Sequence, residues 1–207
     1  MVKKYLRRVP FTIAMTVGLV LVAILTQTHN ARISEIWLAR LGFAPNDLWL
    51  LRIERIFTSA MVTYGGRVFW EALAMFIGAV GVSEWLTSTR RAAFTFWGVH
   101  LLVLVAESLL IALPLSLWGG QSGIDLGLER DVGASVGYFA CLGLVCALLP
   151  GRWRWISAAL VMGGLVFSLF LPPWGGESKL VKLSADIAHL LAFPLGWLSY
   201  KLGRKTT

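Results

Sequence analysis

Six runs of mostly apolar residues, separated by short polar or charged segments, set the hydropathy pattern of the chain. A helix needs about 20 predominantly apolar residues to cross a bilayer. The pattern predicts helices over residues 10–28, 68–86, 92–115, 132–149, 155–171 and 183–200. The fourth and fifth runs are short, and short helices need not be exposed to lipid along their whole length. We therefore expect an all-α membrane protein with a bundle of six transmembrane helices.

Composition agrees with this expectation. Hydrophobic residues make up 57% of the chain and charged residues only 14%, with a mean hydropathy of +0.72, whereas a soluble domain carries roughly 25% charged residues. The 207 residues contain no linker long enough to separate domains, so a single membrane domain over residues 1–207 is predicted. The first apolar run is long enough to span and is followed by no small-x-small cleavage site, so we expect a membrane helix rather than a signal peptide.

The net charge of +8 would suggest a nucleic-acid partner in a soluble protein. Here the basic residues cluster at the ends of apolar runs, which is a topology signal instead, because lysine and arginine are concentrated in cytoplasmic loops. Four such groups alternate with the predicted helices: Lys3, Lys4, Arg7 and Arg8; Arg90 and Arg91; Arg152 and Arg154; and Lys201, Arg204 and Lys205. Six spans place all four groups on one side. Both termini are therefore predicted to be cytoplasmic in a multi-pass protein of the plasma (cell inner) membrane.

The first outer loop, residues 31–67, mixes apolar and charged residues, as in "DLWLLRIERIFTSAM". Such a segment is typical of the membrane interface. Cys141 and Cys146 lie inside one apolar run and are expected to be small core residues. No metal-ligand cluster stands out, so neither a metal nor a cofactor is expected.

Ionisable residues inside apolar runs are expensive to bury and suggest function. The chain places Glu71, His100, Glu107, Asp186 and His189 there, while Glu84 is near a helix end and within reach of the interface. His100 and Glu107 are seven residues apart and share a helix face, which leaves a proton-coupled transporter open as an alternative. Against transport, no inverted repeat or pair of broken helices is evident.

Ser135 and His189 enter their helices from the same outer side, so they lie at comparable depth if the fourth and sixth helices touch. Small residues recur every four positions on both helices: Gly133 and Gly137 on the fourth, and Ala188, Ala192 and Gly196 on the sixth. Such stripes permit close helix contact in membranes. A serine next to a histidine forms a nucleophile with its general base. The structural alternative is that both are ordinary hydrogen-bonded residues of membrane helices.

These residues resemble the rhomboid family of intramembrane serine proteases, which has a six-helix core. Gly133-Ala134-Ser135 is similar to the Gly-x-Ser-Gly motif that opens the fourth helix of that family. Ala188-His189, followed by Ala192 and Gly196, is similar to the Ala-His motif and small-residue stripe of the sixth. The resemblance implies that Ser135 is the nucleophile and His189 the general base. It also implies that Gly133 and Ala134 support the oxyanion site and that the ring of Phe139 stacks on the histidine.

A further block of the chain is similar to bacterial rhomboids. Arg55 and Thr58 in the first outer loop and Glu84 near the end of the second helix fall at the spacings of that family within "ERIFTSAMVTYGGRVFWEALAMFIGAVGVSE". The resemblance thus extends over residues 50–200 and implies structural roles for Arg55, Glu84, Ala192 and Gly196.

The chain departs from the family pattern at several positions. Val136 replaces the glycine after the serine, and Leu191 replaces a small residue after the histidine. The second helix of family members commonly carries a histidine and an asparagine that donate to the oxyanion, and here the same positions are Val68 and Ala72. Losing an oxyanion donor typically costs about 3 kcal/mol of transition-state stabilisation. Trp70 and Glu71 are the nearest polar candidates in the sequence.

The leading hypothesis is a serine endopeptidase that hydrolyses peptide bonds of transmembrane proteins with a Ser135–His189 dyad. Asp186, three residues before His189, is a weaker candidate for a third member that orients the imidazole. The alternative is a catalytically weak or inactive rhomboid-like protein that binds transmembrane helices. The expected partners are transmembrane substrates and the lipid bilayer.

Overall fold

The computed structural model describes residues 7–173 and 178–202, and its regular structure is helical throughout this part of the chain. In chain order the elements are α2 (Pro10–Leu25), α3 (Glu35–Leu41), η1 (Pro45–Asp47), α4 (Glu54–Ser59), α5 (Arg67–Leu86), α6 (Thr89–Glu107), η2 (Ser108–Ala112), α7 (Leu113–Trp118), α8 (Gly120–Leu128), α9 (Ser135–Leu148), α10 (Trp153–Ser168) and α11 (Lys179–Leu202). Each apolar run contains a helix, so the all-α prediction is confirmed. Lys3, Lys4, Arg204 and Lys205, which entered the topology prediction, lie outside the described residues.

Three helical stretches are long and apolar enough to cross a membrane: Arg67–Leu86, Thr89–Trp118 and Lys179–Lys201. The helices α2, α9 and α10 are apolar but shorter, with 16, 14 and 16 residues. At 1.5 Å per residue they measure roughly 21–24 Å, against a hydrocarbon thickness of about 30 Å. The structure therefore supports a membrane protein with at least three candidate spans among its described residues.

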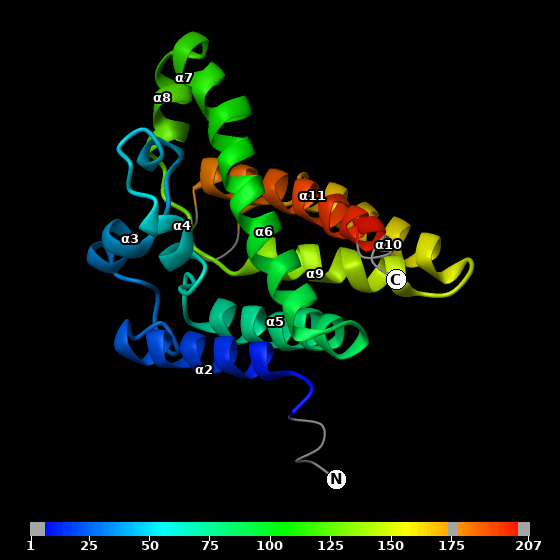
Figure 1. The fold of residues 1–207 in the computed structure, drawn as a ribbon. Coiled ribbons are helices and arrows are strands. Elements are labelled where there is room, and N and C mark those ends of the chain that lie inside the picture. Colours follow the sequence, from blue (N-terminus) through cyan, green and yellow to red (C-terminus); the bar gives the residue numbers. More distant parts are fainter. Residues whose placement is uncertain (1–6, 174–177, 203–207) are drawn as a thin grey trace.

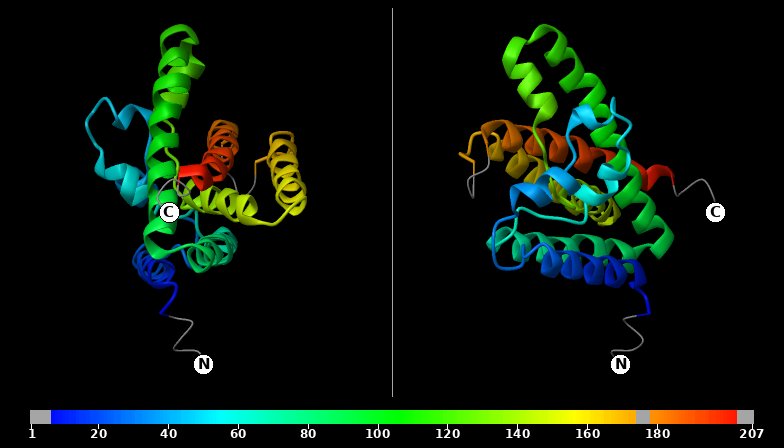
Figure 2. Two further views of the ribbon diagram at one scale, coloured as in Figure 1. Left: turned by 45° about the vertical axis from the view of Figure 1, so that its right-hand side comes forward. Right: turned by 90° about the vertical axis from the view of Figure 1, so that its left-hand side faces the viewer.

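Helices α2, α5, α9, α10 and α11 run roughly alongside one another; α5, α9 and α11 run in one direction and α2 and α10 in the other (Figure 1). Helix α9 lies at the centre and contacts α5, α6, α10 and α11. The stretch from α6 to α7 crosses this layer and projects beyond it, carrying α8 at its far end (Figure 2). This projecting stretch passes through the π-helical turns of η2 just before Pro114, where the missing proline N–H interrupts the α-helical hydrogen bonds.

A buried carboxylate holds one end of the bundle together. Glu84, only 1% exposed, accepts hydrogen bonds from the backbone N–H groups of Phe11 and Thr12 and from the hydroxyls of Thr12 and Thr89, at 2.7–2.9 Å. It thereby caps the first turn of α2, where backbone N–H groups lack helical partners, and links that turn to α5 and α6. The sequence suggested that Glu84 reaches the membrane interface; instead its side chain is turned inward and fully bonded.

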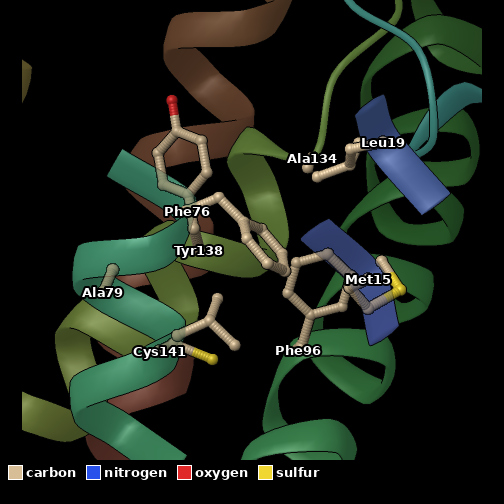
Figure 3. Packing of buried hydrophobic residues seen from close by; sticks show 9 residues of the cluster. Met15, Leu19, Phe76, Ala79, Phe96, Ala134, Tyr138 and Cys141 are labelled. Atoms are coloured by element: carbon tan, nitrogen blue, oxygen red, sulfur yellow. The ribbon is translucent and has the colours of Figure 1, made fainter. Parts of the chain in front are cut away.

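The core beside this anchor is aromatic and aliphatic. Phe96 of α6 packs edge-on against Phe76 of α5 with ring centroids 5.6 Å apart, and Met15 and Leu19 of α2 close the cluster (Figure 3). Tyr138 and Cys141 bring α9 into the same cluster. Burial of this apolar surface fixes α9 between α2, α5 and α6.

Helices α9 and α11 approach each other through small residues, but not the predicted ones on α9. A Cβ atom at Gly196 would lie 1.9 Å from the carbonyl oxygen of Ala140, and one at Gly143 would lie 2.1 Å from that of Phe193. Gly137 faces α6 instead, because a Cβ there would lie 2.3 Å from the Phe96 ring. The stripe of Gly133 and Gly137 was therefore the wrong face of α9; the contact with α11 is made through Val136, Ala140 and Gly143.

The first outer loop forms the short elements α3, η1 and α4 around a second buried carboxylate. Asp47, 1% exposed, accepts from Arg130 at 2.7 Å, from Arg55 at 3.1 Å and from the Ala44 N–H at 3.0 Å. The hydroxyl of Thr58 donates to the Leu41 carbonyl at 2.9 Å. Arg55 and Thr58 thus hold the loop in shape, while the partner carboxylate was not identified from the sequence.

Candidate functional site

The segment entering α9 sets the position of Ser135. Gly133 has a φ of +153°, a conformation that residues with side chains rarely adopt, and its N–H donates to the Ser59 carbonyl at 2.9 Å. Helix α9 consequently starts at Ser135 rather than at the predicted residue 132, with Ala134 as its N-cap. The first helical hydrogen bond runs from the Tyr138 N–H to the Ala134 carbonyl at 3.1 Å. The backbone N–H of Ser135 therefore has no helical acceptor and remains a donor at the positive end of the helix dipole.

The three charged residues just before this segment, Glu129, Arg130 and Asp131, each form hydrogen bonds to another part of the chain. Arg130 binds Asp47 of the first loop, and the backbone of Asp131 exchanges two hydrogen bonds with Phe43 at 2.9 and 3.0 Å. Glu129 accepts from the Ser178 hydroxyl at 2.9 Å, next to the start of α11. The charge cluster that abuts the apolar fourth run is thus a clamp that sets where α9 begins.

Burial and the surrounding arginines fix the charge state of Asp47 in this clamp. Burial alone opposes ionisation, but the hydrogen bonds from Arg130 and the Ala44 N–H, together with the positive charges of Arg130 and Arg55, lower the pKa of the carboxyl below its usual value of 3.8. Asp47 is therefore ionised at neutral pH and holds both arginines.

His189 lies on α11 and contacts α9 through the side chain of Phe139. Its ring lies against that of Phe139, with centroids 4.5 Å apart and planes inclined by 41°. The Nε2 atom of His189 is buried and has no hydrogen-bond partner among the described residues. Because an unbonded buried nitrogen costs free energy, such an atom calls for an explanation in function or in bound water.

Ser135 and His189 line one cavity of about 220 Å³ at the ends of α5, α9 and α11. Its walls come from the first loop, the segment before α9, these three helices and the last residue of α10: Thr63, Tyr64, Val68, Ala72, Asp131, Val132, Gly133, Ala134, Ser135, Tyr138, Ser168, Val181, Lys182, Ala185, Asp186 and His189. No hydrogen bond joins the serine hydroxyl to Nε2, which is a common state of catalytic pairs without substrate. The two predicted residues are nevertheless brought to the same space.

The cavity wall on α5 is apolar where the resemblance called for hydrogen-bond donors. Val68 and Ala72 both line the cavity. Trp70 instead donates its indole N–H to the His29 carbonyl at 3.0 Å on an exposed face, and Glu71 pairs with Arg67 at 2.5 Å. Neither of these two nearby polar residues lines the cavity, so neither replaces the missing donors.

Asp186 lies in the cavity wall but is committed to other partners. Its carboxylate accepts from the Ser168 hydroxyl at 2.9 Å and forms an ion pair with Lys182. Lys182 also donates to the Ser168 carbonyl at 2.5 Å. This group of Ser168, Lys182 and Asp186 joins α10 to α11, and the sequence did not reveal it beyond the four-residue spacing of Lys182 and Asp186.

The remaining buried ionisable groups are dispersed rather than connected. The Nε2 atom of His100 lies 2.9 Å from the Ile56 carbonyl, and Glu107 accepts from the Ser184 hydroxyl. Neither group is bonded to Asp186, and the described residues contain no group of three or more His, Cys, Asp or Glu side chains arranged to hold a metal ion.

Two departures from the rhomboid pattern, Val136 and Leu191, are accommodated by packing. Val136 is buried with Val99 and Val103 of α6 and with Ala188 and Ala192 of α11. Leu191 is 36% exposed and points away from that contact. Neither substitution blocks the approach of α9 to α11.

No protein-family model, no curated protein and no solved structure matches this chain. The likeness to rhomboid proteases therefore rests on its motifs and on the placement of their residues around the cavity.

Proposed function

We propose that the chain is a rhomboid-like intramembrane serine protease that hydrolyses peptide bonds of transmembrane proteins. Ser135 is the nucleophile and His189 the general base. The observation that carries the proposal is that Ser135 and His189 line the same cavity, while the buried Nε2 of His189 has no hydrogen-bond partner among the described residues. An unused imidazole nitrogen beside a serine is costly for stability and useful for proton transfer.

In this reaction the Ser135 Oγ forms a bond to the scissile carbonyl carbon while its proton passes to Nε2 of His189. The carbonyl π electrons move to oxygen, and the backbone N–H of Ser135 donates to the resulting oxyanion. The carbon–nitrogen bond then breaks, and the imidazolium returns the proton to the leaving amine. Water then bonds to the acyl carbon while His189 accepts its proton. The bond between that carbon and Ser135 Oγ breaks, the carboxylic acid product leaves, and the imidazolium returns the proton to Oγ. The Phe139 ring limits the movement of the imidazole throughout.

The arrangement of the helices gives water access to this reaction within a membrane. Helix α9 is short and surrounded by α5, α6, α10 and α11, so its ends need not reach the bilayer surfaces. A central helix that starts below the surface leaves space above Ser135 for water, where the peptide bond of a partly unfolded transmembrane substrate is accessible. We propose that all six apolar helices cross the membrane around it.

Basic residues support the orientation of these six spans in the plasma (cell inner) membrane. The Arg91 guanidinium at the start of α6 donates to the carbonyls of Ser199 and Tyr200 at the end of α11, and Arg8 stacks on Trp85 at the end of α5. These helix ends therefore lie together, opposite the cavity. By the positive-inside tendency this end and both termini are cytoplasmic, and the cavity opens outward.

Cleavage in liposomes tests the proposal. Purified protein is reconstituted with a panel of single-pass transmembrane reporters that carry a fluorescent outer tag, and the cut products are identified by mass spectrometry. We expect cleavage within or near the outer end of a transmembrane segment by the wild type, and none by Ser135→Ala. Full cleavage by Ser135→Ala would refute the mechanism.

A second function is favoured by the apolar wall at Val68 and Ala72. A cavity without donors on α5 suits a catalytically inactive rhomboid-like protein that binds transmembrane helices. Co-purification of a reporter with the wild type and with Ser135→Ala in equal amounts, without cleavage by either, would support this reading.

A further inference from the structure

We propose that the hydroxyl of Tyr138 donates a hydrogen bond to the oxyanion and thereby replaces the donors that α5 lacks. The inference rests on the proposed protease function and names an additional catalytic residue for it. Tyr138 lines the cavity together with Ser135 and His189.

The position of Tyr138 on α9 directs its hydroxyl towards the nucleophile. Residues three apart share a helix face, so Tyr138 lies one turn below Ser135 on the same side. Side chains in a helix tilt towards its N-terminus, and a long one covers the turn before its own Cα atom. The first turn of α9, with Ser135, is that turn.

The ring and the hydroxyl of Tyr138 have different surroundings. The ring is buried in the aromatic cluster with Phe76 and Phe96, which holds it in place. The hydroxyl points away from the other side chains of the cluster (Figure 3). Although Tyr138 is only 8% exposed, its hydroxyl has no hydrogen-bond partner among the described residues. A tyrosine whose ring is fixed and whose O–H has no acceptor can donate a hydrogen bond to an oxygen that becomes negatively charged only during the reaction.

The missing donors and Tyr138 face the same space. Val68 and Ala72 of α5, at the positions of the absent histidine and asparagine, line the cavity beside Tyr138. The tyrosine therefore reaches from α9 into the volume in which donors from α5 would otherwise lie. Its hydroxyl stays protonated throughout: as the Ser135 Oγ bonds to carbon and its proton moves to His189, Tyr138 only donates a hydrogen bond to the new negative oxygen.

A second hydroxyl in the cavity makes the assignment testable by comparison. Thr63 is buried in the cavity wall, and its Oγ1 also lacks a partner among the described residues. It comes from the loop before α5 rather than from the helix that carries Ser135. Thr63→Val removes this hydroxyl and keeps the shape of the side chain.

The experiment measures the rate at which a fluorescent fluorophosphonate modifies Ser135 in purified protein, over a range of probe concentrations. The tetrahedral adduct has an oxygen where the oxyanion develops. We expect Tyr138→Phe to lower the maximal rate, kinact, by about 10²-fold with little change in KI. Thr63→Val should stay within about threefold of the wild type by the same argument. Tyr200→Phe, at the opposite end of α11, is the matched control and should be unchanged.

The outcomes separate this inference from the function on which it rests. A wild-type kinact in Tyr138→Phe, or an effect on KI alone, would overturn the role of Tyr138 and leave the protease intact. A loss in Thr63→Val without one in Tyr138→Phe would also overturn it. If the wild type shows no Ser135-dependent modification, the protease function fails and the inference fails with it. The unfolding temperature of Tyr138→Phe is measured as well; a value equal to that of the wild type would show that the variant retains the fold.

Discussion

Glu84 and His189 both sit in the helical interior, but their hydrogen-bonding atoms are used very differently. The carboxylate of Glu84 accepts from four donors on α2 and α6. The Nε2 atom of His189 is buried without a partner among the described residues. Leaving a buried polar atom unbonded costs about 1–3 kcal/mol. The first arrangement stabilises the bundle, whereas the second is tolerated at a cost in stability.

We expect this difference to separate anchoring residues from those proposed to react. Asp47 belongs with Glu84, because arginines and a backbone N–H occupy its oxygens. Ser135 and Tyr138 are similar to His189. Both residues line the same cavity, and their hydroxyls have no hydrogen-bond partner among the described residues. The comparison predicts that anchors control stability and that cavity residues control chemistry.

The largest change in stability should come from Glu84→Ala. Removing the carboxylate leaves several buried donors unbonded, so we expect the free energy of unfolding to fall by about 3–5 kcal/mol. Glu71→Ala is the matched control on the same helix, since Glu71 is exposed and its ion pair is with exposed Arg67. It should change stability by less than about 0.5 kcal/mol. Denaturant titration of purified protein measures both, and equal effects would remove the distinction.

Asp47→Asn should produce the next largest loss, about 2–3 kcal/mol at neutral pH, because two arginines lose their charged acceptor. The pKa of Asp47 is lowered in the folded protein, so its contribution to stability is fully present above the ordinary pKa of 3.8. It is lost as the pH falls through the lower folded pKa. Unfolding temperatures measured from pH 7 down to pH 3 should therefore converge for the two proteins. A constant difference at every pH would contradict the assignment.

Gly196→Ala should lower both the free energy of unfolding and the rate at which Ser135 is modified. Its Cβ atom would lie 1.9 Å from the Ala140 carbonyl, so α9 and α11 must separate, and Ser135 moves relative to His189. We expect a loss of about 1–3 kcal/mol together with a reduced rate of Ser135 modification. At Gly78 a Cβ meets nothing within 4 Å, so Gly78→Ala should leave the rate unchanged. The account fails here if the folded Gly196→Ala protein reacts at the wild-type rate.

The smallest change in stability should come from Ser135→Ala. The hydroxyl has no hydrogen-bond partner among the described residues, so its removal should alter the free energy of unfolding by less than about 0.5 kcal/mol. The same substitution should abolish cleavage. A loss of stability as large as that of Glu84→Ala would make Ser135 an anchor rather than a nucleophile.

The sequence predicted the approximate positions of the six apolar helices because each apolar run is continuous and bounded by polar residues. It also predicted that Ser135 and His189 lie at comparable depth if the fourth and sixth helices touch, because helix direction follows from the order of the spans; in the structure α9 contacts α11 and both residues line one cavity. It did not predict the partner of Arg55, because Asp47 lies in an irregular loop and its other arginine, Arg130, is far away in the sequence. Contacts of this kind have no periodic signal.

The choice of helix face was another limit of the sequence. Small residues occur on several faces of α9, so Gly137 could be assigned to the contact with α11 although it packs on Phe96. The start of α9 was also set too early, because the positive φ of Gly133 depends on a hydrogen bond to Ser59 in another part of the chain. Nothing in the sequence singled out Tyr138, because a tyrosine within an apolar run is usually a core residue. Its ring is indeed buried in the core.

Labelling with a fluorescent fluorophosphonate tests the central claim most directly. Wild type, Ser135→Ala and His189→Ala are compared in detergent and in bilayers, with the modified residue identified by mass spectrometry. The account predicts an adduct on Ser135 in the wild type and none in either variant. Labelling that is absent from all three proteins, or that persists in Ser135→Ala, would contradict it.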